Sequence, residues 1–223
     1  TRYWRDWSSD VCSSDLGGDL IIRDNGQLQR LALPLLRIVG GAVLVLNQPR
    51  LSELELPELT VTGDHVIIGR HRDLDAALSD ASPGSALSSV ELGALRAVGG
   101  AIVFRNNPKL EQFALPKLSR VGDGLLVEQN RALTQFSIAG GAKILRVIRL
   151  DDNDALTHLA GLSNVLEAQG DLVLTNMDAL KALDGLQNLR KVKGRLHISN
   201  NQLRTLDLPA LETIGATFEI LDH

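Results

Sequence analysis

The residues with the clearest potential for chemistry are Asp151, Asp152 and Asp154, which flank Asn153 in one short run. Carboxylate and amide oxygens are the ligands that Ca²⁺ prefers, so the run is a candidate calcium site. Acidic residues on one sheet also cleave polysaccharides, so a glycosidase-like or lyase-like site is a second interpretation. The interpretation that we favour is a solvated backbone corner, with Arg105 and Glu128 paired between neighbouring repeats.

No other part of the sequence has the residue spacing of a catalytic or metal site. The run Gly122-Asp123-Gly124 lacks the third glycine of a nucleotide-binding loop, and no nucleophile elbow is present. The single cysteine is Cys12, and the histidines have no ligand-type spacing, so no zinc site is expected. We therefore expect a protein that is not an enzyme and that needs no cofactor. The histidines are His65, His71, His158, His197 and His223.

The elements that carry these residues follow from a leucine that recurs along the chain. Its successive intervals are 23, 23, 36, 23, 23, 24 and 23 residues. The long interval exceeds the others by 13 residues, which indicates one regular repeat with an insertion. Such a fixed period is typical of solenoids, in which each repeat contacts only its neighbours. The anchor leucines are Leu28, Leu51, Leu74, Leu110, Leu133, Leu156, Leu180 and Leu203.

Each repeat contains a short aliphatic segment with period two, such as Val43-Leu44-Val45 or Ile102-Val103-Phe104, which predicts one strand per repeat. A lone repeat cannot bury its aliphatic side chains, but stacked repeats can. The sequence therefore predicts an all-β, right-handed parallel β-solenoid of about eight coils of roughly 23 residues. Asparagines that tolerate a tight corner follow the strands at Asn25, Asn107, Asn130, Asn153 and Asn200, with Asn47 and Asn176 shifted by one.

The middle residue of each strand should point away from the side chains that line the core, because side chains alternate along a strand. This column is apolar over its first five members, so it is a candidate protein-binding face. The alternatives are that the insertion or a missing cap covers it, or that the coil buries both faces of the sheet. The column reads Ile21, Leu44, Ile67, Val103, Leu126, Arg149, Val173 and His197.

The solenoid is expected to span residues 18–223, with an excursion around residues 76–95. Ser88 and Glu91 have the spacing of a capping box ahead of a short helix. Residues 5–16, RDWSSDVCSSDL, resemble a translated sequencing-library adapter, so residues 1–17 are interpreted as a non-native or disordered tail. The last repeat starts at Gly215 and stops before its leucine, and both ends therefore look truncated.

Charge and hydropathy restrict the partners. The formal net charge is −4 with both signs scattered along the chain, so no basic stripe suits nucleic acid. No run of 18 apolar residues is present, so we expect no membrane contact from this segment.

The segment Leu183–Gly215 and the run GAIVFRNNPKL at Gly100–Leu110 resemble receptor L-domains, above all those of bacterial surface proteins. A bacterial surface leucine-rich repeat with a Leu-Pro step is a sibling possibility. The disulfide-bonded cysteines of animal receptor L-domains are absent, so receptor signalling is not carried over. The resemblance implies a solenoid at a cell surface or outside the cell, in contact with a ligand or carbohydrate.

The leading functional hypothesis is a non-enzymatic binding or adhesion module for a protein or glycan partner. A structural spacer or cell-envelope scaffold is the alternative, although a spacer has little reason to interrupt its coils with an insertion. A β-helical enzyme that acts on polysaccharides through Asp151 and Asp152 is the third hypothesis.

Overall fold

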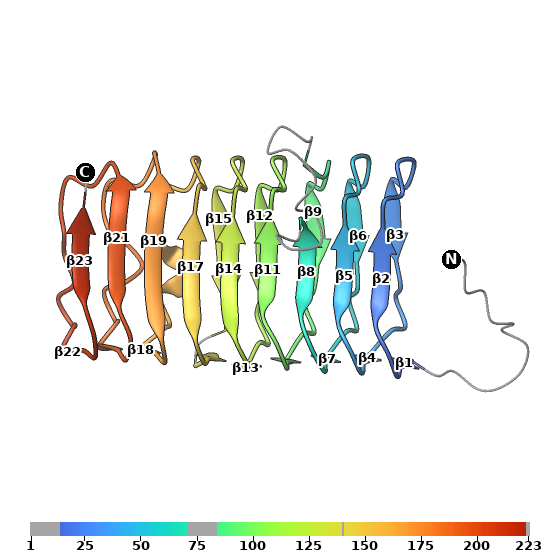
Figure 1. The fold of residues 1–223 in the computed structure, drawn as a ribbon, viewed down its shortest axis with the longest axis horizontal. Helices are drawn as coiled ribbons and strands as arrows, with labels where there is room; N and C mark the ends of the chain where they lie inside the picture. Colours follow the sequence, from blue (N-terminus) through green and yellow to red (C-terminus); the bar gives the residue numbers. More distant parts are fainter. Residues whose placement is uncertain (1–13, 71–83, 140, 222–223) are drawn as a thin grey trace, which may run out of the picture.

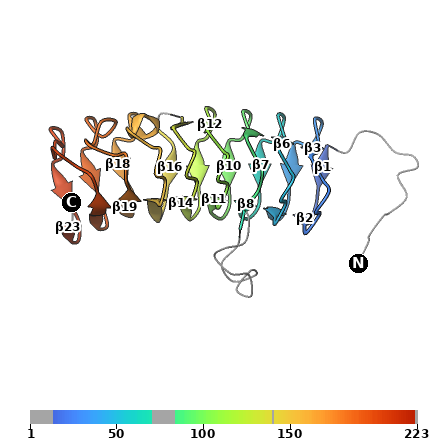
Figure 2. The ribbon, with the colours of Figure 1, turned by 90° about the horizontal axis from the view of Figure 1, so that it is seen from above.

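The computed structural model describes residues 14–70, 84–139 and 141–221, and it confirms an all-β parallel solenoid. Figures 1 and 2 show the coils stacked in chain order along one axis. No helix in the described ranges is both long and apolar enough to span a bilayer.

One strand from every coil joins a nine-stranded parallel sheet, called here the long sheet. Partners in this sheet are 23 residues apart over much of the chain, as in the pairs Leu20 with Val43 and Gly124 with Val147. Eight steps of about 4.8 Å give the sheet a length of about 38 Å along the axis. Its strands are β2 (Leu20–Arg23), β5 (Val43–Leu46), β8 (Val66–Gly69), β11 (Ile102–Arg105), β14 (Gly124–Glu128), β17 (Val147–Asp151), β19 (Asp171–Met177), β21 (Leu196–Asn201) and β23 (Phe218–Leu221).

Shorter strands form the other sides of the coils. A six-stranded sheet contains β1 (Asp15–Leu16), β4 (Ile38–Val39), β7 (Val61–Thr62), β10 (Ala97–Val98), β13 (Arg120–Val121) and β16 (Lys143–Ile144), and a three-stranded sheet contains β18 (Glu167–Ala168), β20 (Lys191–Val192) and β22 (Thr213–Ile214). The third side has β3 (Arg30–Ala32), β6 (Glu53–Glu55) and β9 (Ser89–Glu91) in one sheet, β12 (Gln112–Leu115) and β15 (Gln135–Ile138) in another, and the 3₁₀ helix η1 (Ala160–Leu162).

The core is one continuous column of hydrophobic, mostly aliphatic side chains from these three sides. Most anchor leucines lie in it: Leu51, Leu110, Leu133, Leu156 and Leu180 are at most 1% exposed. This burial explains the sequence period, because each coil needs one leucine at the same point of its circuit.

Close stacking also explains a column of glycines at Gly40, Gly63, Gly99 and Gly122. A Cβ atom at any of the last three would lie within about 2 Å of the carbonyl oxygen of the glycine in the preceding coil. No side chain fits there, because contacts that short would push the coils apart.

The third coil differs from the sequence expectation. Ser89 pairs with Glu53 and Ala97 pairs with Val61, each at a separation of 36 residues, and Leu87 is fully buried. Leu87 is therefore the core leucine that stacks 23 residues before Leu110, whereas Leu74 lies outside the described residues. The 13 additional residues fall between Gly69 and Leu87, so residues 87–95 belong to the regular coil.

Two further expectations about local structure were wrong. The segment with the capping-box spacing forms strand β9, because Val90 takes the inward position that Leu54 holds one coil earlier. At the start, Asp15 and Leu16 pair with Ile38 and Val39, so the solenoid begins before residue 18. The rest of the expected tail, residues 1–13, lies outside the described residues.

Candidate functional site

The middle residues of the long-sheet strands form one straight column, as expected. The register connects Ile21, Leu44, Ile67, Val103, Leu126, Arg149, Val173 and His197 in that order and continues to Glu219. Their side chains alternate with those of the core, so they lie on the outer face of the long sheet.

This column is not one exposed apolar strip. Ile21 is 54% exposed, but Ile67, Val103 and Val173 are between 4% and 6% exposed. A second hydrophobic cluster, separate from the core, contains Leu46, Ile67, Ala101 and Val103, with Leu44 and Leu126 at its margin. The burial of these residues agrees with the alternative that the coil buries both faces of the sheet, rather than with a continuous exposed strip. Residues 71–83, the part of the insertion that was considered as its cover, lie outside the described residues.

The predicted pair between neighbouring coils, Arg105 and Glu128, is confirmed on this face. The Arg105 Nε and Nη2 atoms each lie 2.6 Å from Glu128 Oε2. Their side chains are only 10% and 3% exposed, so the pair is buried rather than part of a solvated corner. Removing Glu128 would leave the buried guanidinium of Arg105 without this counter-ion, which is the costly case for such pairs.

Arg149 is the accessible cation of the column. It lies between Leu126 and Val173 in the register and is half-buried. Within the described part of the chain, its guanidinium makes no hydrogen bond or ion pair. Five N–H donors in a fixed fork are therefore available to a carboxylate or carbonyl of a ligand.

The three carboxylates of the candidate calcium site do not converge. Asp151 Oδ1 accepts hydrogen bonds from Thr175 Oγ1 at 2.7 Å and from Asn176 Nδ2 at 2.8 Å. The carboxylates of Asp152 and Asp154 flank the guanidinium of Arg131 instead. Arg131 Nη2 lies 3.7 Å from Asp152 Oδ2, and Arg131 Nε lies 3.6 Å from Asp154 Oδ2. No group of three or more potential ligand side chains gathers within the described ranges.

Burial raises the pKa of Asp152 above its ordinary value of 3.8, and the nearby carboxylate of Asp154 raises it further, against the opposing effect of Arg131. At the other end of the solenoid, a hydrogen bond from Asn47 lowers the pKa of Asp24. Both aspartates occupy the same left-handed corner position, with φ of 54° and 57°.

The last two coils bring together a serine, a histidine and a glutamate that the sequence reading missed. His197 Nδ1 lies 2.8 Å from Glu219 Oε2, and His197 Nε2 lies 3.1 Å from Ser199 Oγ. In the tautomer whose Nδ1–H donates to Glu219, His197 Nε2 accepts a hydrogen bond from the Ser199 hydroxyl group. The sequence pattern that could have revealed this relay is His197 and Ser199 two residues apart, on one face of β21, with Glu219 opposite His197 in the next coil.

The corner asparagines divide into two columns. Asn107, Asn130 and Asn153 are fully buried, and the backbone N–H and side-chain amide of Asn107 both donate to Asn130 Oδ1 at 3.1 Å. Asn200 belongs to the other column, which is left-handed and exposed, while Asn201 takes the buried position of that coil. Asn200 therefore has the left-handed corner backbone expected of these asparagines, whereas Asn107, Asn130 and Asn153 are not among the described residues with positive φ. Asn25 is exposed and donates to Arg23 O.

The outer face thus offers hydrogen-bonding groups, one available cation and partly exposed apolar side chains on a rigid sheet. Such a surface can recognise a ligand without bond-making chemistry. Comparison of the chain with protein-family models, with curated proteins and with solved structures finds no match.

Proposed function

We propose that the protein is a non-enzymatic binding module that recognises a protein or glycan partner through the outer face of the long sheet. The observation that carries the proposal is Arg149, a half-buried guanidinium with no partner in the described part of the chain and with apolar neighbours on both sides. Arginine with an apolar surround is a common anchor of binding interfaces. The resemblance to bacterial surface L-domains supports a place at a cell surface or outside the cell.

The arrangement favours recognition over a spacer role. A spacer needs only complementary coil-to-coil contacts, and an unpaired guanidinium on its sheet contributes nothing to them. Partial burial of Arg149 removes some of its hydrogen bonds to water, and a ligand carboxylate or carbonyl would replace them by accepting hydrogen bonds from the guanidinium.

The experiment presents the purified chain to a glycan array and to a displayed library of random peptides. We expect saturable ligands whose binding falls about tenfold or more in Arg149→Glu, because charge reversal repels a ligand acceptor. The control is Lys143→Glu, an exposed charge reversal on β16 in another sheet, which should change binding by less than about twofold. The proposal is contradicted if the chain enriches no ligand whose binding depends on Arg149.

The Ser199–His197–Glu219 relay favours a second candidate function, hydrolysis of an ester. In this mechanism the Ser199 hydroxyl oxygen attacks the ester carbonyl carbon while His197 Nε2 takes its proton. The protonated histidine then gives that proton to the leaving alcohol, and water hydrolyses the acyl-serine. Ser199 is only 7% exposed, and its strand β21 lies between β19 and β23. Donors for the developing oxyanion would therefore have to come from outside the sheet backbone.

A fluorophosphonate probe separates the two candidates, because it labels serines that a neighbouring base activates. Under the binding proposal, wild type and Ser199→Ala label equally weakly. Labelling that maps to Ser199 and disappears in both His197→Gln and Ser199→Ala would favour the hydrolase.

A further inference from the structure

The coil stack opens on one side, between β9 and β12. These two neighbouring strands belong to separate sheets. On one side of the opening the backbone bonds continue to the preceding coil, where Ser88 N donates to Ser52 O. On the other side they continue to the following coil, where Thr134 N donates to Glu111 O. The neighbouring sides stay closed, because Ala97 pairs with both Val61 and Arg120, and Ile102 pairs with both Val66 and Leu125. The edges of β9 and β12 that face each other therefore have backbone groups outside the sheet ladder.

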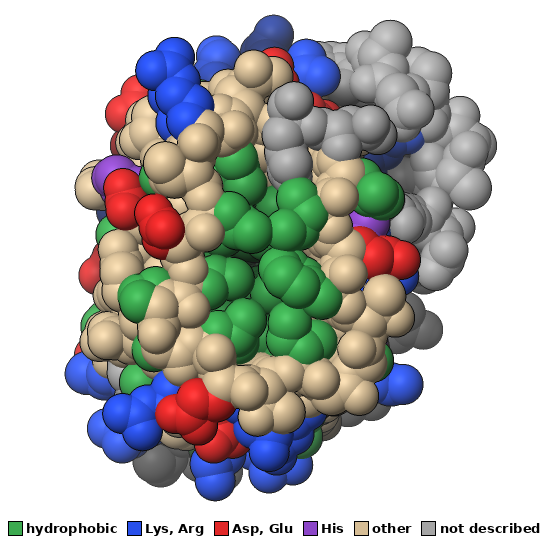
Figure 3. All heavy atoms as spheres, turned by 90° about the vertical axis from the view of Figure 1, so that its left-hand side faces the viewer, with side chains coloured by type: hydrophobic (Ala, Val, Ile, Leu, Met, Phe, Trp, Pro, Cys, Tyr) green, Lys and Arg blue, Asp and Glu red, His purple; other side chains and the backbone are tan. Residues whose placement is uncertain are grey.

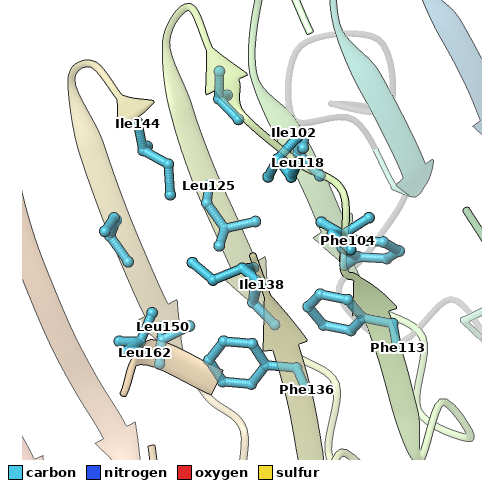
Figure 4. Packing of buried hydrophobic residues seen from close by; sticks show 14 of the residues in the cluster. Ile102, Phe104, Phe113, Leu118, Leu125, Phe136, Ile138, Ile144, Leu150 and Leu162 are labelled. Atoms are coloured by element: carbon cyan, nitrogen blue, oxygen red, sulfur yellow. The ribbon is translucent and has the colours of Figure 1, made fainter. Parts of the chain in front are cut away.

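Aromatic side chains explain the opening. Phe113 stacks on Phe104 with ring centroids 4.2 Å apart, and Phe136 stacks on Phe113 at 5.5 Å, as Figure 4 shows. The preceding coil has the smaller Ile68 and Val90 at the positions of Phe104 and Phe113. We attribute the missing pairing between β9 and β12 to these larger rings, which need more room inside the coil than Ile68 and Val90.

The opening is a surface cleft of about 430 Å³, within the range of small-ligand sites, roughly 300–1,000 Å³. Hydroxyl and amide groups line its rim, on Ser88, Ser89, Gln112, Gln135 and Ser137, and all five residues are exposed. Beneath them lie the nearly buried rings of Phe113 and Phe136 and the half-buried Val90, while Ala114 is exposed beside the rim. Among the described residues, no charged side chain lines the cleft, and Gln135 Nε2 donates to Gln112 Oε1.

We propose that this cleft binds a neutral saccharide of about two sugar units. A sugar presents hydroxyl groups that both donate and accept, which matches side-chain amides, hydroxyls and free strand edges. Its apolar C–H face matches the aromatic and aliphatic floor. Anionic sugars are disfavoured, because no cation lines the cleft among the described residues. Acidic side chains also lie nearby in the sequence, with Glu91 at the end of β9 and Glu111 just before β12.

The site lies on a different side of the coil from Arg149, so it is independent of the binding face proposed above. The experiment titrates neutral disaccharides and trisaccharides of hexoses and N-acetylhexosamines into the whole chain by calorimetry and by saturation-transfer NMR. We expect saturable binding with a dissociation constant of about 0.1–5 mM, typical of a shallow polar site. Uronic-acid and sulfated analogues should bind about tenfold more weakly.

The variant Ser137→Trp fills the cleft from an exposed position of β15 and should weaken binding about tenfold or more, with little change in thermal midpoint. The matched control is Ser119→Trp, an exposed serine outside the cleft, and Arg149→Glu should also leave saccharide binding unchanged. The variant Phe113→Leu should let β12 approach β9 and remove binding in a chain that still unfolds cooperatively. Absence of saturable binding by every neutral sugar up to about 50 mM, or binding equal in Ser137→Trp and Ser119→Trp, would overturn the proposal.

Discussion

The buried asparagines show how single side chains hold the corners of the solenoid. Asn130 Nδ2 donates to Phe104 O at 2.9 Å and to Glu128 O at 3.1 Å, and its Oδ1 accepts from the backbone and side chain of Asn107. Each asparagine therefore satisfies main-chain groups of its own coil and of the coil before it. Because these groups are inaccessible to water, no solvent molecule can replace the lost amide without rearrangement.

Asn130→Ala should lower the free energy of unfolding by about 2–4 kcal/mol, because it leaves buried carbonyl and N–H groups without partners. Urea denaturation followed by circular dichroism measures the change. Asn164→Ala, at an exposed asparagine, is the control and should change stability by less than about 0.5 kcal/mol. Equal stability of the two variants would show that the buried amides do not support the corners.

The left-handed aspartates predict opposite dependences on pH. The pKa of Asp152 is raised, so the folded state holds this proton more tightly, and stability falls as pH rises from 3.8 through the raised pKa. Asp152→Asn has no carboxylate at this position, so its free energy of unfolding at pH 7 should be higher than that of wild type. The difference should disappear below about pH 3.5, where Asp152 is protonated in wild type.

Asp24→Asn is the matched comparison, because Asp24 has the same corner geometry but a lowered pKa. Its carboxylate contributes stability above the ordinary value of 3.8 that is lost as pH falls through the lowered pKa. This variant should therefore lose stability relative to wild type at pH 7 and approach it in acid. Thermal midpoints measured from pH 3 to pH 8 that moved in parallel for both variants would contradict the assignment.

The two asparagine columns also mark where sequence reading fails at the residue scale. Counting three residues back from the anchor leucine finds Asn107, Asn130 and Asn153, but in the last complete coil it finds Asn200. There the buried residue is Asn201, only two positions before Leu203, because the corner is one residue shorter. Adjacent asparagines look equivalent in a sequence, and only the strand register distinguishes them.

At the scale of elements, the strands and their parallel stacking were predictable because an aliphatic period of 23 residues leaves few other ways to bury the same face. The anchor of the third coil was not found by counting, since Leu74 lies 23 residues after Leu51 and Leu87 lies 23 residues before Leu110. The residues around Leu87 contained the missing signal. Leu87, Val90, Leu92 and Leu95 repeat the spacing of Leu51, Leu54, Leu56 and Leu59.

The candidate sites were less predictable than the strands, because they depend on contacts between coils and on coil width. The Arg105–Glu128 pair followed from the period alone, since its members are 23 residues apart. The Ser199–His197–Glu219 relay required knowledge of which residues share an outer face across two coils. The cleft beside β12 depends on two stacked rings that widen one coil, which no local pattern in the sequence reports.

At the scale of the whole molecule, stability depends on contacts between successive coils. Figure 3 views the end that contains β23, where hydrophobic side chains occupy the centre of the coil within a polar rim. Leu206 and Phe218 in this last region are 43% and 45% exposed, whereas Leu183 and Leu196 one coil earlier are at most 3% exposed. The same side chains are thus buried only when another coil stacks on them.

Whole coils should therefore be removable in register. Deleting residues 125–147 joins Gly124 to Ile148, and the register already pairs Gly124 with Val147 and Leu125 with Ile148. Arg105 would then face Asp151 instead of Glu128, and Asn107 would face Asn153. The shortened chain should unfold cooperatively, with a denaturant m-value lower by about one-ninth, because one of nine stacked layers is lost. Deleting only residues 125–136 is the control, since it removes half a circuit and brings Ser137 to the inward position of Leu125 and Ile138 to the outward position of Leu126. This deletion should abolish cooperative unfolding. If both deletions behaved alike in urea, the coils would not be the units whose stacking stabilises the molecule.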